Sequence, residues 1–151
     1  MDIHIIDDDE ILRSVYTALA RSLNYRAKAF SGPDAYLEYM GCGEYLPPNL
    51  TILSDVEMPK MSGYELMDMV RKTYPDQRFI IFTGGTPRID PKNEFACFYF
   101  IKPISIGQLE KVFKALSLCA ESGPSDRIGC ASIDDRRAFS IKDWHCPLRA
   151  N

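Results

Sequence analysis

Short apolar runs alternate with segments of helical periodicity through residues 1–120, and this alternation constrains the fold most strongly. Apolar residues between the runs recur at three- and four-residue spacing, as in Ile11, Val15 and Leu19, which is typical of amphipathic helices. Strands that alternate with helices form a parallel sheet through right-handed crossovers, and fully apolar strands need helices on both faces. We therefore predict an α/β fold with a doubly wound, five-stranded parallel sheet. Its strands are expected at residues 3–6, 26–30, 50–54, 79–82 and 98–101.

Polar residues mark where several of the helices begin. Asp8 or Asp9 can cap the helix that follows the first strand, because a carboxylate accepts the unpaired N–H groups of a first turn. A third helix is expected over about 63–72. Ser105 followed by Gln108 forms a capping-box pattern, which predicts the start of the last helix.

The connection between the fourth and fifth strands is unusually short. Residues 84–97 must supply two loops and a helix, and they include Pro87 and Pro91. Asp90 could cap a helix that begins at Pro91, but only about two turns fit the remaining length. The sequence therefore predicts a shortened fourth helix.

Residues 121–151 differ in character from residues 1–120. Glu121 to Asp126 has the Ser, Gly and Pro composition of a linker, and the remainder shows no sustained period. Some thirty residues are too few for an effector domain of ordinary size. We expect a domain over 1–120 followed by a linker and tail over 121–151. Trp144 beside Leu148 indicates that the tail docks on a surface.

Charge and composition exclude several classes of function. Eighteen basic and 21 acidic side chains give a net charge of −3, which argues against binding nucleic acid or an anionic membrane through bulk charge. No apolar run approaches the roughly 20 residues that cross a bilayer, and no signal-peptide pattern is visible. Five cysteines without a CxxC pair fit reduced thiols. We expect a cytoplasmic protein.

Polar residues follow the predicted strands at the points where the strands end. Asp7 and Asp8 follow the first strand, Asp55 the third, Thr83 the fourth and Lys102 the fifth. The carboxyl ends of parallel strands meet at one edge of the sheet, where ligands of open α/β folds bind. The sequence therefore predicts that three carboxylates, a hydroxyl and an ammonium group meet at this edge.

This set of groups suits phosphoryl transfer. Neighbouring carboxylates repel and raise one another's pKa values, so the cluster needs a counter-charge. Mg²⁺ prefers such oxygen ligands, and Lys102 adds a positive point charge. A carboxylate can act as a nucleophile and form an acyl phosphate, while the Thr83 hydroxyl can donate to a phosphoryl oxygen.

Short motifs at these strand ends resemble those of the response regulator receiver domain of two-component and phosphorelay signalling. Each fragment is weak alone, but their order and placement are specific. The resemblance covers residues 1 to about 120 and implies a flavodoxin-like sheet in the order 2-1-3-4-5. The fragments are Ile5-Ile6-Asp7-Asp8-Asp9, Ser54-Asp55-Val56-Glu57-Met58-Pro59, Met61-Ser62-Gly63, Phe82-Thr83-Gly84 and Phe100-Ile101-Lys102-Pro103.

The resemblance implies a role for each residue at the site. Asp55 is expected to be the phosphoacceptor, with Lys102 bridging to the phosphoryl group. Mg²⁺ is expected to bind Asp7, Asp8, Asp55 and the backbone carbonyl of Glu57.

The resemblance also implies a conformational switch. Thr83 moves toward the phosphoryl group, and the ring of Tyr99 turns inward into the vacated space. The Lys102–Pro103 peptide bond is expected to be cis, which is an isomer essentially restricted to X–Pro bonds.

The expected function is that of a signalling switch, with no enzymatic activity beyond autophosphotransfer and slow autodephosphorylation. A sensor histidine kinase or a histidine phosphotransfer protein would supply the phosphoryl group, and an unidentified protein would receive the signal from a monomer or weak homodimer.

Two alternatives remain open from the sequence. A Mg²⁺-dependent phosphohydrolase would use the same chemistry, and Asp7 with Asp9 has the acid spacing of such enzymes. A receiver-like interaction module would work without phosphorylation. His4 lies within a strand and is interpreted as structural, not as a phosphoryl carrier.

Overall fold

A computed structural model describes residues 1–84, 95–122, 146 and 148, and its centre is a five-stranded parallel sheet. The strand order is β2-β1-β3-β4-β5, with every neighbouring pair parallel. This architecture confirms the predicted flavodoxin-like fold. The strands are β1 (Asp2–Ile6), β2 (Arg26–Phe30), β3 (Thr51–Asp55), β4 (Phe79–Thr83) and β5 (Phe98–Ile101).

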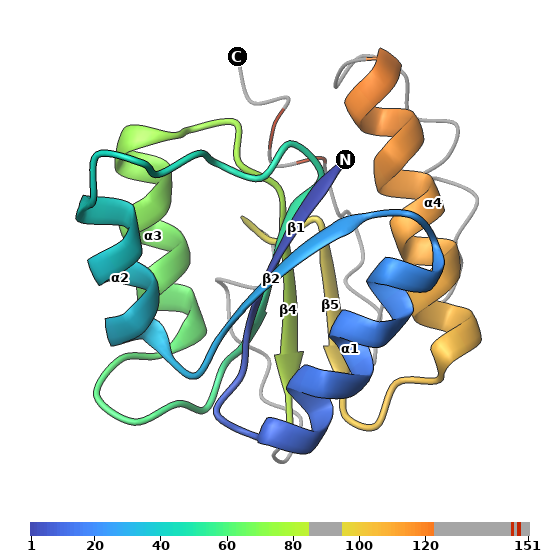
Figure 1. Ribbon diagram of the computed structural model, residues 1–151, viewed down its shortest axis with the longest axis horizontal. Helices are drawn as coiled ribbons and strands as arrows, with labels where there is room; N and C mark the ends of the chain where they lie inside the picture. Colours follow the sequence, from blue (N-terminus) through green and yellow to red (C-terminus); the bar gives the residue numbers. More distant parts are fainter. Residues whose placement is uncertain (85–94, 123–145, 147, 149–151) are drawn as a thin grey trace.

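Helices cover both faces of the sheet (Figure 1). Buried side chains of α1 and α4 pack with one face of the strands, and those of α2 and α3 pack with the other. These two hydrophobic clusters explain why the strands are apolar on both faces. The helices in the described part of the chain are α1 (Glu10–Ser22), α2 (Pro33–Gly41), α3 (Gly63–Thr73) and α4 (Ile106–Ser122).

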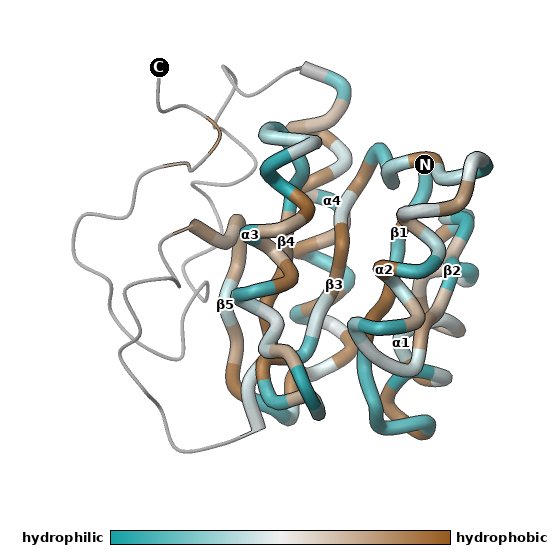
Figure 2. The backbone as a smooth tube through the Cα atoms, turned by 90° about the vertical axis from the view of Figure 1, so that its left-hand side faces the viewer, coloured by the Kyte–Doolittle hydropathy of each residue, from teal (hydrophilic) through white to brown (hydrophobic). Residues whose placement is uncertain are grey.

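The central strands carry most of the core. Every residue of β3 and β4 is buried, and the centre of the sheet contains strongly hydrophobic stretches when the chain is coloured by hydropathy (Figure 2). Burying one large aliphatic or aromatic side chain contributes about 1.5–3 kcal/mol. The β3 and β4 backbones are thus held rigidly up to the residues at which they end.

Caps start the helices close to the strand ends. The Asp9 carboxylate accepts hydrogen bonds from the N–H groups of Ile11 and Leu12 at 2.9 and 3.1 Å, so Asp9 is the cap of α1. Ser105 and Gln108 form the predicted capping box of α4, with Ser105 Oγ 3.1 Å from the Gln108 N–H. Each such cap contributes about 1 kcal/mol, and the Asp9 cap fixes the turn that carries Asp7 and Asp8.

Two expectations concern parts of the chain that the structure describes incompletely. The predicted short helix between β4 and β5 falls on residues 85–94, which lie outside the described residues. In the tail, Trp144 is also outside them, whereas Leu148 is half-buried and packs against the core shared by α1 and α4. The domain boundary at residue 120 stays a prediction.

Candidate functional site

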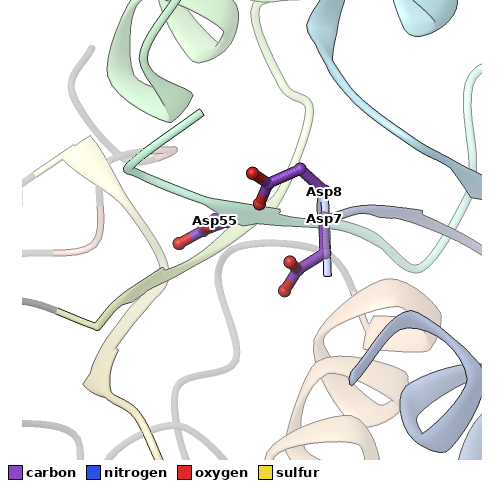
Figure 3. A group of neighbouring side chains, drawn as sticks. All are labelled: Asp7, Asp8 and Asp55. Carbon is purple, nitrogen blue, oxygen red and sulfur yellow. The ribbon is translucent and has the colours of Figure 1, made fainter. Parts of the chain in front are cut away.

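Three carboxylates from two adjacent strands meet at the carboxyl edge of the sheet. Asp7 and Asp8 follow β1, Asp55 ends β3, and one ligand oxygen from each lies within 4.8 Å of the others. In Figure 3 the side chains of Asp7 and Asp8 extend from the end of β1 on the side of Asp55. The meeting follows from the register, because Ile6 pairs with Ser54 and the next residues of both strands are neighbours.

Lys102, which follows the edge strand β5, supplies a positive charge to the carboxylates. Its Nζ lies 2.9 Å from Asp7 Oδ2 and 3.4 Å from Asp55 Oδ1. Burial lowers the pKa of Lys102, but its hydrogen bond with Asp7 and the negative charges of Asp55 and Asp7 outweigh burial, so the pKa lies above its usual value. Lys102 therefore stays protonated and partly neutralises the cluster.

Asp7 is the most enclosed of the three carboxylates. It is fully buried, and its Oδ1 accepts a hydrogen bond of 2.9 Å from the Asp9 N–H. Arg13 Nη1 donates to the Asp7 main-chain carbonyl at 2.7 Å. By contrast, Asp8 is exposed. Asp7 is thus fixed in place by the protein, while Asp8 presents its carboxylate to solvent.

Asp55 is buried, and the hydrogen bonds and positive charge around its carboxylate only partly offset the loss of water. Burial raises the pKa of its carboxyl group to about 6; Lys102 opposes this shift, and the charges of Asp7 and Glu57 add to it. Among the described residues, Asp55 Oδ1 has no hydrogen-bond partner, since the approach of Lys102 is a long ion pair. A buried acceptor in this state is costly to leave unpaired, so the site is incomplete without a further positive or donor group.

The donor set matches a hard divalent cation. All three candidate ligands are carboxylates, and oxygen ligands of this kind, with few carboxylates and room for water, suit Mg²⁺. A cation would also stabilise the unpaired Oδ1 of Asp55. In the described part of the chain, this is the group of acids and potential ligands close enough to hold a metal. The residues therefore fit Mg²⁺.

Thr83 lies at the end of β4, but its hydroxyl donates a hydrogen bond to Glu57 Oε1. The main-chain N–H of Gly84 donates to Glu57 Oε2 at 3.1 Å. From the sequence, only the backbone carbonyl of Glu57 was predicted to take part in the site. The presence of an acid two residues after Asp55 was visible, but nothing in the sequence indicated where its side chain would point.

Gly63 is a second residue whose place at the site was not predicted from the sequence. A Cβ atom on Gly63 would lie 2.2 Å from the main-chain oxygen of Asp55 and 3.1 Å from Ser54 Oγ. Backbone atoms cannot move aside as a flexible side chain can, so any larger residue would displace the end of β3. Gly63 stood in the Met61-Ser62-Gly63 fragment, but nothing in the sequence indicated that it would pack against the end of β3.

As predicted, Tyr99 lies within β5 and Pro103 directly follows Lys102. Tyr99 is buried in β5, pairs with Ile81 and packs in the cluster shared with α2 and α3. The Lys102–Pro103 bond is cis, which confirms the prediction.

A model of the response regulator receiver domain family matches residues 3–114. This chain belongs to that family. Receiver domains are signalling switches, and those of response regulators are phosphorylated by histidine kinases or phosphotransfer proteins. The cluster of Asp7, Asp8 and Asp55 is consistent with phosphorylation and with Mg²⁺ binding.

This chain matches only part of the length of the following curated relatives. Two-component response regulator ORR7 of Oryza sativa subsp. japonica is 35% identical over 113 residues, which are 71% of this chain and 52% of that protein. Response regulator protein TmoT of Ectopseudomonas mendocina is 36% identical over 88 residues, which are 55% of this chain and 36% of that protein. The receiver domain thus spans about half of the first relative and about a third of the second.

A solved structure supports the fold. Response regulator protein TrrA of Thermotoga maritima, crystallised in complex with Mg²⁺-BeF, superposes with a TM-score of 0.66 at 24% identity, covering 76% of this chain and 97% of that one. At this identity the similarity shows the fold alone. In the described residues, no helix is long and apolar enough to cross a membrane.

Proposed function

We propose that this receiver domain accepts a phosphoryl group on Asp55 in the presence of Mg²⁺. The observation that carries the proposal is the state of the Asp55 carboxylate, which is buried between Asp7, Asp8 and Lys102 with one oxygen unpaired. A carboxylate needed only for stability would have its hydrogen bonds satisfied. An unpaired oxygen at a ligand-binding edge instead suits a nucleophile.

Asp7, Asp8, Asp55 and the backbone carbonyl of Glu57 would hold Mg²⁺. When bound, the ion neutralises negative charge that gathers as the phosphoryl oxygens approach. The buried Asp7 fixes one side of the metal site, while the exposed Asp8 can adjust to the ion and its waters.

The transfer itself relies on the chain's own groups. An Asp55 oxygen forms a bond to phosphorus as the bond from phosphorus to the donor's histidine nitrogen breaks, and the imidazole leaves with the electron pair. Lys102 Nζ, which already lies 3.4 Å from Asp55 Oδ1, would contact a phosphoryl oxygen. Thr83 would donate its hydroxyl to another oxygen, and Tyr99 would respond as the second part of the switch. Attack by water on phosphorus restores the carboxylate and releases phosphate.

The donor would be a sensor histidine kinase or a histidine phosphotransfer protein, and the readout would be altered binding of a downstream protein. Residues 1–120 would form the switch, with residues 121–151 as an appended segment. We further propose a cytoplasmic monomer or weak homodimer that does not itself bind nucleic acid.

One observation disfavours the phosphohydrolase alternative. That reading needs Asp9 as a second acid, but Asp9 Oδ1 accepts hydrogen bonds from the N–H groups of Ile11 and Leu12 as the cap of α1. Asp9 is therefore committed to the helix start. A domain that acts as a switch should take up phosphate once per chain instead of turning over phosphate esters.

The test uses the full chain with acetyl phosphate, with either Mg²⁺ or EDTA, followed by intact-mass analysis. We expect one phosphoryl group per chain with Mg²⁺ and none with EDTA or in Asp55→Asn. Steady turnover of p-nitrophenyl phosphate would favour the hydrolase instead. Equal labelling of the wild type and Asp55→Asn would refute the assignment of Asp55.

A further inference from the structure

Glu57 lies two residues after Asp55, yet its carboxylate is not part of the metal-ligand cluster of Asp7, Asp8 and Asp55. Its two oxygens accept hydrogen bonds from different donors at the end of β4. Oε1 accepts from the Thr83 hydroxyl, and Oε2 accepts from the Gly84 N–H at 3.1 Å. This two-pronged contact joins the loop after β3 to the loop after β4.

The donors contacted by Glu57 lie beside Asp55 at the end of β4. The ends of β3 and β4 are tied together, since the Val56 N–H donates to the Phe82 carbonyl at 2.7 Å. Thr83 and Gly84 follow directly after Phe82 and therefore lie next to the position of Asp55. The strand order places β4 between Asp55 on β3 and Lys102 after β5, so the donors at the end of β4 lie in the same part of the site as Lys102.

We propose that the Glu57 carboxylate stands in for the phosphoryl group in the resting chain by occupying the Thr83 and Gly84 donors that the phosphoryl group would use. This inference rests on the proposed function of Asp55. It assigns Glu57 as a positioning residue that slows phosphorylation, because its carboxylate must leave these donors before phosphoryl oxygens can reach them.

Charge supports the same competition. A carboxylate and a phosphoryl group are both anionic acceptors, and like charges at short range repel. The charge of Glu57 already acts on Asp55, since it is among the charges that raise the pKa of that carboxyl group. Glu57 is exposed, so its side chain has room to swing into solvent when the donors are claimed.

Substitution of Glu57 should therefore accelerate labelling. Glu57→Ala removes both hydrogen bonds and the negative charge, and we expect the rate of phosphorylation by acetyl phosphate to rise about tenfold. In this step an Asp55 oxygen bonds to phosphorus while acetate leaves with the electrons of its bond to phosphorus. Glu57→Gln, which keeps the size but loses the charge and one acceptor oxygen, should give an intermediate rise.

The experiment measures initial labelling rates of the full chain by intact mass with Mg²⁺ and acetyl phosphate. Glu10→Ala is the matched control, because it removes an exposed acid at the start of α1 at the same edge; its rate should stay within about twofold of wild type. A second readout needs neither metal nor phosphodonor: the Gly84 amide resonance should move upfield in Glu57→Ala and stay in place in Glu10→Ala.

The outcomes separate the two proposals. Absence of label in the wild type and in every variant would overturn the function proposed for Asp55 and, with it, this role of Glu57. Normal, Asp55-dependent labelling that Glu57→Ala does not accelerate would overturn the role of Glu57 alone. An unchanged Gly84 amide in Glu57→Ala would also overturn it, because the contact would then not exist in solution.

Discussion

Two buried polar groups of the sheet, His4 in β1 and Asp55 at the end of β3, have opposite hydrogen-bonding environments. His4, in the middle of β1, is buried with its Nδ1 3.0 Å from the Tyr36 hydroxyl, which in turn lies 2.9 Å from the Tyr45 hydroxyl. Asp55, at the end of β3, is equally buried but keeps an oxygen without a hydrogen-bond partner in the described part of the chain. The His4 ring is hydrogen-bonded within the protein, whereas Asp55 Oδ1 is left as an unpaired acceptor.

Burial also shifts the pKa values of these two groups in opposite directions. Burial lowers the pKa of His4 to about 4, with the charge of Lys28 adding to the effect, so the ring is neutral and suited to its aromatic surroundings. Burial raises the pKa of Asp55 to about 6, so ionising this carboxyl group is harder than ionising an exposed aspartate. A satisfied buried group indicates structure, and an unsatisfied one at a strand end indicates function.

The largest expected effect comes from removing the positive charge at the strand-end site. Lys102→Ala leaves the fully buried Asp7 without its ion-pair partner, and we expect the free energy of unfolding of the metal-free protein to fall by about 3 kcal/mol. Mg²⁺ should restore much of this loss. Urea denaturation with and without Mg²⁺ measures it.

Lys114→Ala is the control for this loss, because it breaks an exposed ion pair with Glu110 and should change stability by less than about 0.5 kcal/mol. A loss in Lys102→Ala as small as in this control would contradict the account.

A smaller loss is expected on the His4 side. Tyr36→Phe removes the hydroxyl that lies between His4 and Tyr45, leaving buried polar atoms unpaired, and should lower the free energy of unfolding by about 1–3 kcal/mol. Mg²⁺ should not restore it. Tyr39→Phe is the matched control, since Tyr39 contributes its ring to the same cluster. If Mg²⁺ restored the free energy of unfolding of Tyr36→Phe, the His4 cluster and the carboxylate site would not be independent.

Asp55→Asn should stabilise the metal-free protein at pH 7. The folded chain binds the Asp55 proton more tightly than the unfolded chain does, since the pKa rises from 3.8 to about 6. This group's stabilising contribution is therefore full below pH 4 and is lost as the pH rises through about 6. The gain in Asp55→Asn should be about 1–2 kcal/mol at pH 7 and should vanish near pH 4. Thermal unfolding across this range measures it; a destabilised variant at pH 7 would count against an uncompensated Asp55.

His4→Gln should show the opposite pH dependence with a comparable amplitude. The pKa of His4 is depressed on folding from 6.5 to about 4, so the unfolded chain binds the proton more tightly and stability falls as the pH drops below about 6.5. Without His4, the acid-induced fall between pH 6.5 and 4 should lessen by about 1 kcal/mol. An unchanged profile in the same thermal-unfolding series would show that His4 is not buried in its neutral form.

The comparison also explains what could be predicted from the sequence. The site of Asp7, Asp8, Asp55 and Lys102 followed from the positions of these residues at strand ends, because parallel strands bring their carboxyl ends to one edge whatever the side-chain details. Strand β5 and the capping box of Ser105 were predicted for the same kind of local reason.

Tertiary contacts could not be predicted in this way. The pairing of His4 with Tyr36 joins residues 32 positions apart, and the contact of Glu57 with Thr83 joins residues 26 apart. Each depends on a side-chain rotamer and on how a loop or helix packs, neither of which a periodic pattern encodes. The close approach of Gly63 to Asp55 likewise arises only when α3 packs against the end of β3.

The most direct test of the account locates the phosphoryl group. The chain is labelled with acetyl phosphate and Mg²⁺, reduced with borohydride, which converts an aspartyl phosphate to homoserine, and sequenced as peptides by tandem mass spectrometry. We predict homoserine at position 55, dependent on Mg²⁺. Reduction at Asp7 or Asp8 instead, or label that survives reduction on His4, would contradict the assignment of the unpaired Asp55 carboxylate as the acceptor.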